Sequence, residues 1–153
     1  MQINSLFFST LFGLGTISKF PGTLASFFSL FIIWILKDNL KIQNLLILYI
    51  IILLFSLVVV SISLRKIKKK DPKEIVIDEF MGQFTTLLFL PNDIKFYVLG
   101  FLLFRFFDII KPYPISYLDK KDDAIGVVFD DILAGSFAYA LIHISFFLLS
   151  NIK

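Results

Sequence analysis

The sequence predicts an all-α membrane protein, a compact bundle of about five hydrophobic helices that forms a single domain over residues 1–153. Apolar residues make up 58% of the chain, twenty residues are Phe, and the mean hydropathy is +0.87. This is more apolar surface than the interior of a soluble domain of this size can hide. Charged residues are also absent from stretches long enough to cross a bilayer, and that absence carries more weight than the average composition.

The expected helices follow in order along the chain. Residues 20–36 form a short apolar run that begins at a Pro-Gly turn, and residues 42–64 form an uncharged run that would be about 34 Å long as a helix. Residues 75–90 and 94–110 are shorter, carry charge at one end and are separated by a turn-like Pro-Asn-Asp sequence. These two segments are either spans shielded by their neighbours or helices that lie on the membrane surface. Residues 132–152 form a last uncharged run of spanning length.

The distribution of Lys and Arg predicts the orientation of these helices. The loop after residue 64 is strongly basic, so the positive-inside rule places it in the cytoplasm. If all five segments span, the N-terminus is also cytoplasmic. Apart from Arg105 within a span, ten basic residues then lie on the cytoplasmic side and four on the other. The basic residues of that loop are Arg65, Lys66, Lys68, Lys69, Lys70 and Lys73.

In this orientation, polar residues from four separate segments fall at the cytoplasmic end of the bundle. Ionisable groups within apolar segments are costly, and a functional site is the default interpretation. Chance placement would scatter such groups over both ends, so their convergence predicts a site. The residues are those of the Phe20-Pro21-Gly22-Thr23 turn, Asp78, Glu79, Arg105, Asp108, Lys111, Asp130 and Asp131.

The composition of this polar group indicates its chemistry. Five crowded carboxylates repel one another, so either several are protonated or a cation holds them. Oxygen ligands without nearby His or Cys favour Mg²⁺ or Mn²⁺ over zinc, and the chain has no Cys. Arg105 and Asp108 lie about one helical turn apart, so they address the same point. Metal, Arg and Lys together are typical of sites that stabilise charge in phosphoryl transfer.

Each element also has a simpler structural explanation. An internal ion pair accounts for Arg105 and Asp108, and acidic residues are favourable in the first turn of a helix, which accounts equally for Asp130 and Asp131. Thr23 is a possible N-cap. Adjacent residues on a helix point about 100° apart, so one carboxylate of each doublet is expected to contact a metal directly.

Four blocks of the sequence resemble the phosphatidylglycerophosphatase A family, with matching order and spacing from about residue 10 to residue 140. The longest block is residues 104–115, which read FRFFDIIKPYPI. Two departures concern loop shape: Asp123-Ala124 stands where the family often has Gly-Gly, and Ala25 stands where Gly is usual. The other blocks are Gly13-Leu14-Gly15 leading to Pro21-Gly22-Thr23 and Ser26, residues 77–82 (IDEFMG), and Asp130-Asp131 followed by Ala134-Gly135.

The resemblance implies a Mg²⁺-dependent hydrolase of the bacterial inner membrane that converts phosphatidylglycerophosphate to phosphatidylglycerol and inorganic phosphate. Membrane lipids are the other expected partners, and no nucleic acid is expected. We expect metal ligands among Asp78, Glu79, Asp130 and Asp131, with Asp108 nearby as a further catalytic residue. Arg105, Lys111, Thr23 and Ser26 are the expected substrate-binding residues. Both a metal-activated water and an aspartyl-phosphate are compatible with this set, and the oligomeric state is left open.

Three alternative functions can be compared with the same set of polar residues. A cation-coupled membrane transporter would employ the same carboxylates, but near the membrane midplane rather than at one end. A phosphotransferase acting on CDP-activated lipids would carry an Asp-x-x-Asp-Gly pattern, which the sequence lacks. A non-catalytic membrane scaffold would not explain the converging acids.

Overall fold

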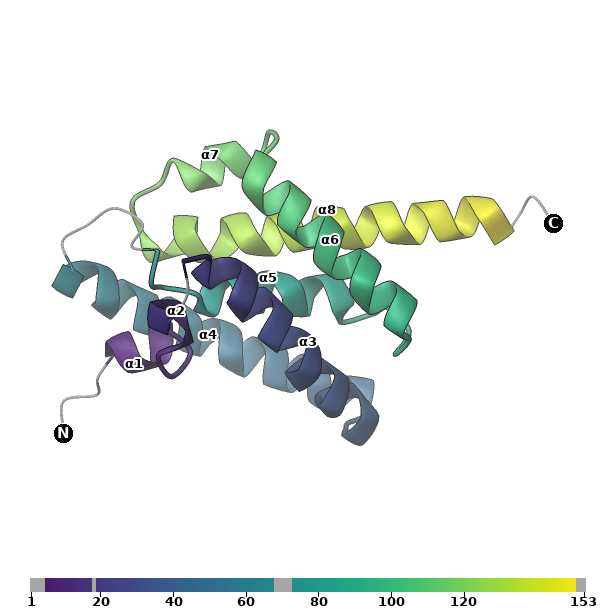
Figure 1. Cartoon of the computed structure of the whole chain (residues 1–153), viewed down its shortest axis with the longest axis horizontal. Helices are drawn as coiled ribbons and strands as arrows, with labels where there is room; N and C mark the ends of the chain where they lie inside the picture. Colours follow the sequence, from purple (N-terminus) through teal and green to yellow (C-terminus); the bar gives the residue numbers. More distant parts are fainter. Residues whose placement is uncertain (1–4, 18, 68–72, 151–153) are drawn as a thin grey trace.

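The computed structural model describes residues 5–17, 19–67 and 73–150, with side chains as far as residue 148, and this part of the chain contains helices and no strand. The all-α prediction is therefore confirmed. The helices, shown in Figure 1, are α1 (Ser5–Ser9), α2 (Leu14–Ile17), α3 (Pro21–Asn39), α4 (Ile42–Ile67), α5 (Ile77–Leu87), α6 (Ile94–Ile110), α7 (Ile115–Asp119) and α8 (Ala124–Ser150).

Three of the described helices, α3, α4 and α8, are long and apolar enough to cross a membrane. The prediction of five spanning segments is therefore wrong in number. Helix α5 has 11 residues, a length of about 16 Å, which covers roughly half of the hydrocarbon core of a bilayer. Helix α6, with 17 residues, is also shorter than the three long helices. The apolar composition of α5 reflects burial by protein, because nine of its 11 residues are buried within the bundle.

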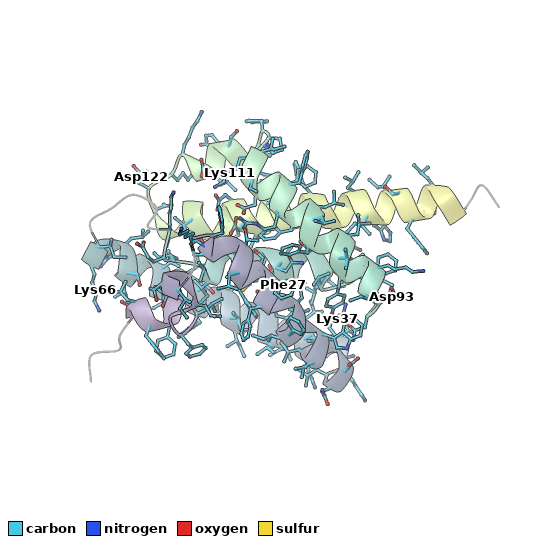
Figure 2. All side chains as sticks on the ribbon, viewed as in Figure 1. Phe27, Lys37, Lys66, Asp93, Lys111 and Asp122 are labelled. Atoms are coloured by element: carbon cyan, nitrogen blue, oxygen red, sulfur yellow. The ribbon has the colours of Figure 1, made fainter. Side chains whose placement is uncertain are left out.

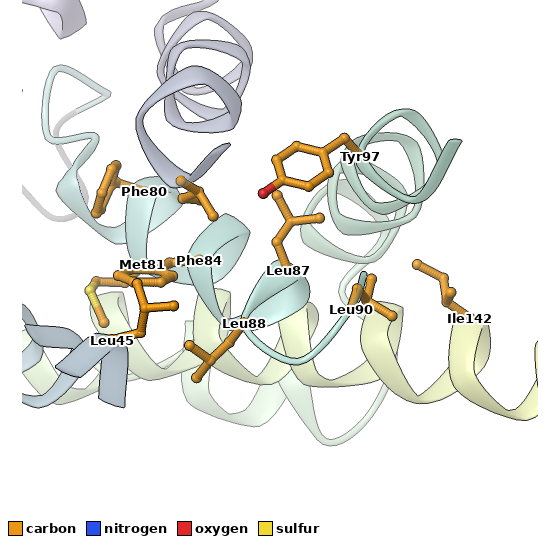
Figure 3. Close-up of a cluster of buried hydrophobic side chains, with 10 residues drawn as sticks. Leu45, Phe80, Met81, Phe84, Leu87, Leu88, Leu90, Tyr97 and Ile142 are labelled. Atoms are coloured by element: carbon orange, nitrogen blue, oxygen red, sulfur yellow. The ribbon is translucent and has the colours of Figure 1, made fainter. Parts of the chain in front are cut away.

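The core of the bundle surrounds α5. Figure 3 shows side chains of α5 and the segment after it in contact with neighbours from the other helices. Helix α5 thus behaves as a buried core helix, and its inward-facing residues include the polar ones discussed below. The cluster comprises Ile33, Leu45, Phe80, Met81, Phe84, Leu87, Leu88, Leu90, Tyr97 and Ile142.

Helices α5 and α8 approach closely at two glycines. A Cβ atom added to Gly135 would lie 2.2 Å from the carbonyl oxygen of Gly82. A Cβ on Gly82 would lie 2.7 Å from the carbonyl oxygen of Asp131. Small residues let helix backbones approach in this way. The contact brings the first turn of α5 beside Asp131.

The other end of α5 is held by α3. The Lys37 ammonium donates hydrogen bonds to the backbone oxygen of Leu87, at 2.7 Å, and to that of Leu90. The Asn92 amide donates to the Asp38 carboxylate at 2.5 Å. The carbonyl groups at the end of a helix lack intrahelical donors, so Lys37 supplies a charged substitute.

Four helix ends meet on one side of the molecule. Helices α3, α5 and α8 begin there and α6 ends there, with α7 alongside, whereas the C-terminal end of α8 projects at the other side (Figure 1). Lys111 and Asp122 lie at this end, and Lys37 and Asp93 lie toward the opposite end (Figure 2).

Candidate active site

A cavity of about 270 Å³ opens where these four helix ends meet. Its lining contains seven acidic and five basic side chains, so it carries a net negative charge when all are ionised. A phosphate dianion is repelled by such a lining unless a cation is also bound. The charged residues of the lining are Asp78, Glu79, Asp108, Asp119, Asp122, Asp130, Asp131, Lys19, Lys73, Arg105, Lys111 and Lys121.

Three of these carboxylates form a tight group. One oxygen from each of Asp78, Glu79 and Asp131 lies within 4.8 Å of the others. The Oε2 atom of Glu79 is buried and accepts no hydrogen bond from the described residues. Burial and, next in importance, the charge of Asp131 raise the pKa of the Glu79 carboxyl to about 8. Hard oxygen ligands in this arrangement fit a Mg²⁺ ion, which would offset both the repulsion and the unmet acceptor.

Asp130, expected as a metal ligand, is placed differently. Its Oδ2 atom accepts a hydrogen bond from the Lys111 ammonium at 2.7 Å, and its Oδ1 atom accepts one from the backbone N–H of Asp131 at 2.9 Å. It is not in the carboxylate group, because adjacent helical residues diverge by about 100°. Of the doublet Asp130 and Asp131, only Asp131 joins the carboxylate group. Of the doublet Asp78 and Glu79, both residues join it.

Lys111 lies directly after α6 in a left-handed conformation, with φ of 47°. Its backbone N–H closes the helix on the Phe107 oxygen at 2.8 Å, and the Pro that follows prevents the helix from continuing. Its ammonium contacts Asp119 at 2.5 Å as well as Asp130. Burial by itself lowers the pKa of Lys111, but the hydrogen bonds to Asp119 and Asp130 outweigh burial and raise that pKa. Lys111 therefore stays positively charged.

Asp119, in α7, was not predicted as a site residue. It lies in a stretch of sequence that also contains Lys120, Lys121 and Asp122, so its charge has the pattern of an ordinary solvated loop. Only the short α7, which folds back against α8, brings it to Lys111.

Arg105 and Asp108 form the internal ion pair that their spacing predicted. The Arg105 Nη1 atom lies 2.5 Å from Asp108 Oδ2, and the two side chains are 17% and 12% exposed. The Nε atom of Arg105 is buried and has no hydrogen-bond acceptor among the described residues. The guanidinium is thus oriented by one carboxylate and still has a donor for another oxyanion.

The start of α3 packs against these charged groups. A Cβ atom on Gly22 would lie 2.1 Å from Glu79 Oε1 and 3.1 Å from Arg105 Nη1. Phe20 is the N-cap of this helix, so the possible N-cap role of Thr23 is not observed. Thr23 instead lies in the first turn, is exposed and lines the cavity. The first backbone N–H groups of a helix lack intrahelical acceptors and attract anions.

Ser26, the other expected substrate-binding residue of α3, does not line the cavity. Its side chain is fully buried, and its hydroxyl donates to the Gly22 carbonyl oxygen at 2.7 Å. One turn of helix therefore moves it from the cavity wall into the bundle interior.

The departure at Asp123 has a structural explanation. The Asp123 carboxylate accepts a hydrogen bond from the backbone N–H of Gly126 at 2.8 Å, as an N-cap does. A Cβ on Gly126 would lie 2.7 Å from the Lys121 carbonyl oxygen, so the retained glycine keeps this loop tight. The start of α8, and with it the Asp130-Asp131 turn, is thus supported by a side-chain cap.

Comparison with known proteins identifies the family. The family model described as Phosphatidylglycerophosphatase A matches residues 7–146, which include all of the cavity. A phosphatidylglycerophosphatase A from Haemophilus influenzae is 34% identical over 133 residues, 86% of this chain and 82% of that protein. A phosphatidylglycerophosphatase A from Escherichia coli is 39% identical over 75 residues, 48% of this chain and 44% of that protein.

A putative phosphatidylinositol-3-phosphatase from Bacteroides thetaiotaomicron is 35% identical over 79 residues, half of each chain. No solved structure matches. The coverage by the family model and by the Haemophilus protein is nearly complete, and the same named activity class recurs among these relatives. The chain therefore belongs to the phosphatidylglycerophosphatase A family, and it is an enzyme of the phosphatase class.

Proposed function

We propose that the protein hydrolyses phosphatidylglycerophosphate to phosphatidylglycerol and inorganic phosphate, as a step of phosphatidylglycerol synthesis in the bacterial inner membrane. The observation that carries this proposal is the group of three carboxylates within 4.8 Å, in one cavity with Arg105 and Lys111. That cavity lies at one end of a bundle with three apolar helices of spanning length. A lipid headgroup at the membrane boundary would therefore meet both cations and metal ligands.

A metal fits the acidic part of the cavity. We propose that Asp78, Glu79 and Asp131 hold one or two Mg²⁺ ions, with Asp108 nearby. When bound there, Mg²⁺ would neutralise charge that develops on the phosphoryl oxygens and lower the pKa of a coordinated water. Asp130 then has a separate role, because its hydrogen bond to Lys111 positions that ammonium.

The remaining polar groups bind the phosphomonoester. Arg105 presents its guanidinium with Asp108 behind it, and Lys111 is held charged between Asp119 and Asp130. The backbone N–H groups at the start of α3, near Gly22 and Thr23, supply neutral donors. These groups are already oriented to stabilise the negative charge that develops on the phosphoryl oxygens in the transition state. Such preorganised stabilisation is the largest single contribution to the rate in many enzymes. Attack by a water and attack by an Asp carboxylate are both compatible with this arrangement.

The proposed orientation places this cavity in the cytoplasm, together with the N-terminus. Arg65 and Lys66 end α4 on the cavity side of the molecule, and Lys19 and Lys73 line the cavity itself. This basic side is the one that the positive-inside rule assigns to the cytoplasm. Lys68, Lys69 and Lys70, which contributed to the prediction, lie outside the described residues.

The first experiment measures phosphate release from phosphatidylglycerophosphate by protein purified in detergent, with Mg²⁺ and with EDTA. Release that requires Mg²⁺ and is lost in Asp131→Asn supports both reaction and site. Asp93→Asn, at the opposite end of the bundle, is the matched control and should retain activity, because Asn also serves as an N-cap. No release with any divalent metal would overturn the proposal.

The same assay tests the headgroup. One relative is named a putative phosphatidylinositol-3-phosphatase, so phosphatidylinositol 3-phosphate is the appropriate competing substrate. If the protein prefers that lipid, the proposed phosphatase reaction stands and the proposed substrate headgroup is replaced. The transporter alternative has no support, because the carboxylate group lies where helices begin, at one end of the bundle.

A further inference from the structure

A second cavity, of about 470 Å³, is an apolar groove between α3 and α6. Its floor is formed by the buried Tyr97, whose ring contacts that of Trp34 with centroids 4.8 Å apart. Four of its lining side chains are exposed, so the groove is open to the surroundings of the bundle; they are Phe27, Phe31, Ile94 and Val98. Phe27 marks its position in Figure 2. The lining residues are Phe27, Leu30, Phe31, Trp34, Ile94, Tyr97 and Val98.

The groove and the polar cavity lie along the same two helices. Helix α3 begins at the cavity and α6 ends there, and a Cβ on Gly22 would lie only 3.1 Å from the Arg105 guanidinium. At 1.5 Å per residue, Leu30 lies about 10 Å along α3 from Thr23, and Trp34 lies about 16 Å along. On α6, Val98 lies about 10 Å from Arg105, and Ile94 about 16 Å. Both walls therefore place the groove at the same depth from the site.

A ring contact lies at the end of the groove nearest the polar cavity. Phe27 and Phe101 meet edge to face with centroids 6.2 Å apart, between the charged ends of α3 and α6 and the deeper groove. The surface formed by α3 and α6 thus changes from charged to apolar along one line. A lipid phosphomonoester changes in the same direction, from a charged phosphate to an apolar acyl chain.

We propose that this groove binds one acyl chain of the lipid whose phosphate is hydrolysed in the polar cavity, which rests on the proposed function. A chain that follows α3 and α6 away from the headgroup enters the groove without crossing another helix. Bilayer lipid is as apolar as the groove, so transfer into it adds little affinity. The contribution of the groove is to orient the glycerol and phosphate relative to Arg105, Lys111 and the carboxylates.

The test compares two substrates and two matched variants in detergent micelles. The substrates are phosphatidylglycerophosphate with long acyl chains and its dihexanoyl analogue, which is too short to fill the groove. Val98→Trp fills the groove from a position that is 50% exposed. Val58→Trp makes the same change on α4, at a position that is 57% exposed and outside both cavities.

We expect Val98→Trp to lower kcat/KM for the long-chain substrate about tenfold, because a misplaced headgroup costs rate steeply. Turnover of the dihexanoyl analogue should stay within about twofold of the unaltered protein, and Val58→Trp should change neither. Equal losses on both substrates, or no loss on the long-chain substrate, would overturn the groove while leaving the proposed function intact. Failure of the unaltered protein to hydrolyse either substrate would instead overturn the proposed function.

A second measurement does not depend on turnover or on the folding of Val98→Trp. A phosphatidylglycerophosphate analogue with a diazirine on one acyl chain is photoactivated with the unaltered protein, and labelled peptides are mapped. Labelling concentrated on α3 and α6, and displaced by unlabelled phosphatidylglycerophosphate but not by phosphatidylcholine, supports the groove. Labelling spread equally over α4 and α8, or displaced by any lipid, shows that bulk lipid occupies it and overturns the proposal.

Discussion

The substitution Gly22→Ala should separate the geometry of the site from the stability of the fold. The added Cβ would lie 2.1 Å from Glu79 Oε1, whereas ordinary contacts begin at 3.4 Å. The carboxylate oxygen must therefore move by about 1.3 Å or more. Glu79 has a flexible side chain, so it can retreat without moving a helix, and Ala is a better helix former than Gly by about 1 kcal/mol. Stability should be unchanged or slightly higher.

The same displacement should be costly for function. Glu79 would leave the group in which its oxygen lies within 4.8 Å of those of Asp78 and Asp131. Misplacement of a reacting group by about 1 Å costs on the order of 100-fold in rate. We therefore expect kcat/KM to fall about 10- to 100-fold and the Mg²⁺ concentration for half-maximal activity to rise about tenfold.

The assay titrates Mg²⁺ in the phosphate-release reaction and follows thermal unfolding of the same samples. Gly100→Ala is the matched control, because its Cβ would meet side-chain atoms outside the cavity lining: Leu87 at 3.0 Å, Thr86 at 3.2 Å and Gln83 at 3.9 Å. It should leave activity and Mg²⁺ dependence unchanged. Full activity of Gly22→Ala with an unaltered Mg²⁺ titration would refute the role given to Glu79. A parallel loss of activity and thermal stability would refute the separation of site from fold.

Four further outcomes are expected. Gly135→Ala forces a Cβ to within 2.2 Å of the Gly82 backbone oxygen, which cannot retreat as a side chain can. It should therefore lower the free energy of unfolding by about 3 kcal/mol, and a melting temperature equal to that of the unaltered protein would contradict the close helix contact. Lys111→Met leaves the Asp130 carboxylate, which is 6% exposed, without its ammonium partner. We expect the free energy of unfolding to fall by about 2 kcal/mol and kcat to fall at least 100-fold. Unchanged turnover would show that Lys111 does not act in the site. Mg²⁺ at about 100 times its dissociation constant should raise the free energy of unfolding of the protein by about 2.7 kcal/mol. It should not raise that of Asp131→Asn. Equal stabilisation of both proteins would show that the ion binds elsewhere. The chain has no cysteine, so single cysteines introduced as Lys66→Cys and Lys95→Cys report the topology. In intact cells an impermeant thiol reagent should label Lys95→Cys and leave Lys66→Cys unlabelled. Labelling of Lys66→Cys alone would mean that the proposed orientation is inverted.

Much of the site follows from the sequence because its residues are anomalous there. Asp78, Glu79, Arg105 and Asp131 interrupt apolar segments, and such positions are costly without a function. The structure brings these side chains to one cavity. Helical spacing also predicted the ion pair between Arg105 and Asp108, which is a local contact within one turn.

The parts that could not be predicted depend on packing between distant segments. Hydropathy does not distinguish a helix buried in protein from one buried in lipid, so α5 resembled a span although it has only 11 residues. The direction of Ser26 depends on how α3 is rotated against its neighbours, and the role of Asp119 depends on α7 folding back on α8. The division of labour between Asp130 and Asp131 likewise follows from where Lys111 lies.

The attachment of Lys37 to the last carbonyls of α5 has a mechanical consequence. Helix α5 carries Asp78 and Glu79 in its first turn and is gripped by Lys37 at its far end, about 16 Å away along the helix axis. A short helix moves as a rigid unit, so a small rotation or shift at one end also displaces the other end. The register of the acid pair is therefore set partly from the opposite side of the molecule, and alterations near residues 37–41, distant from any substrate, are a route by which turnover can be tuned or lost.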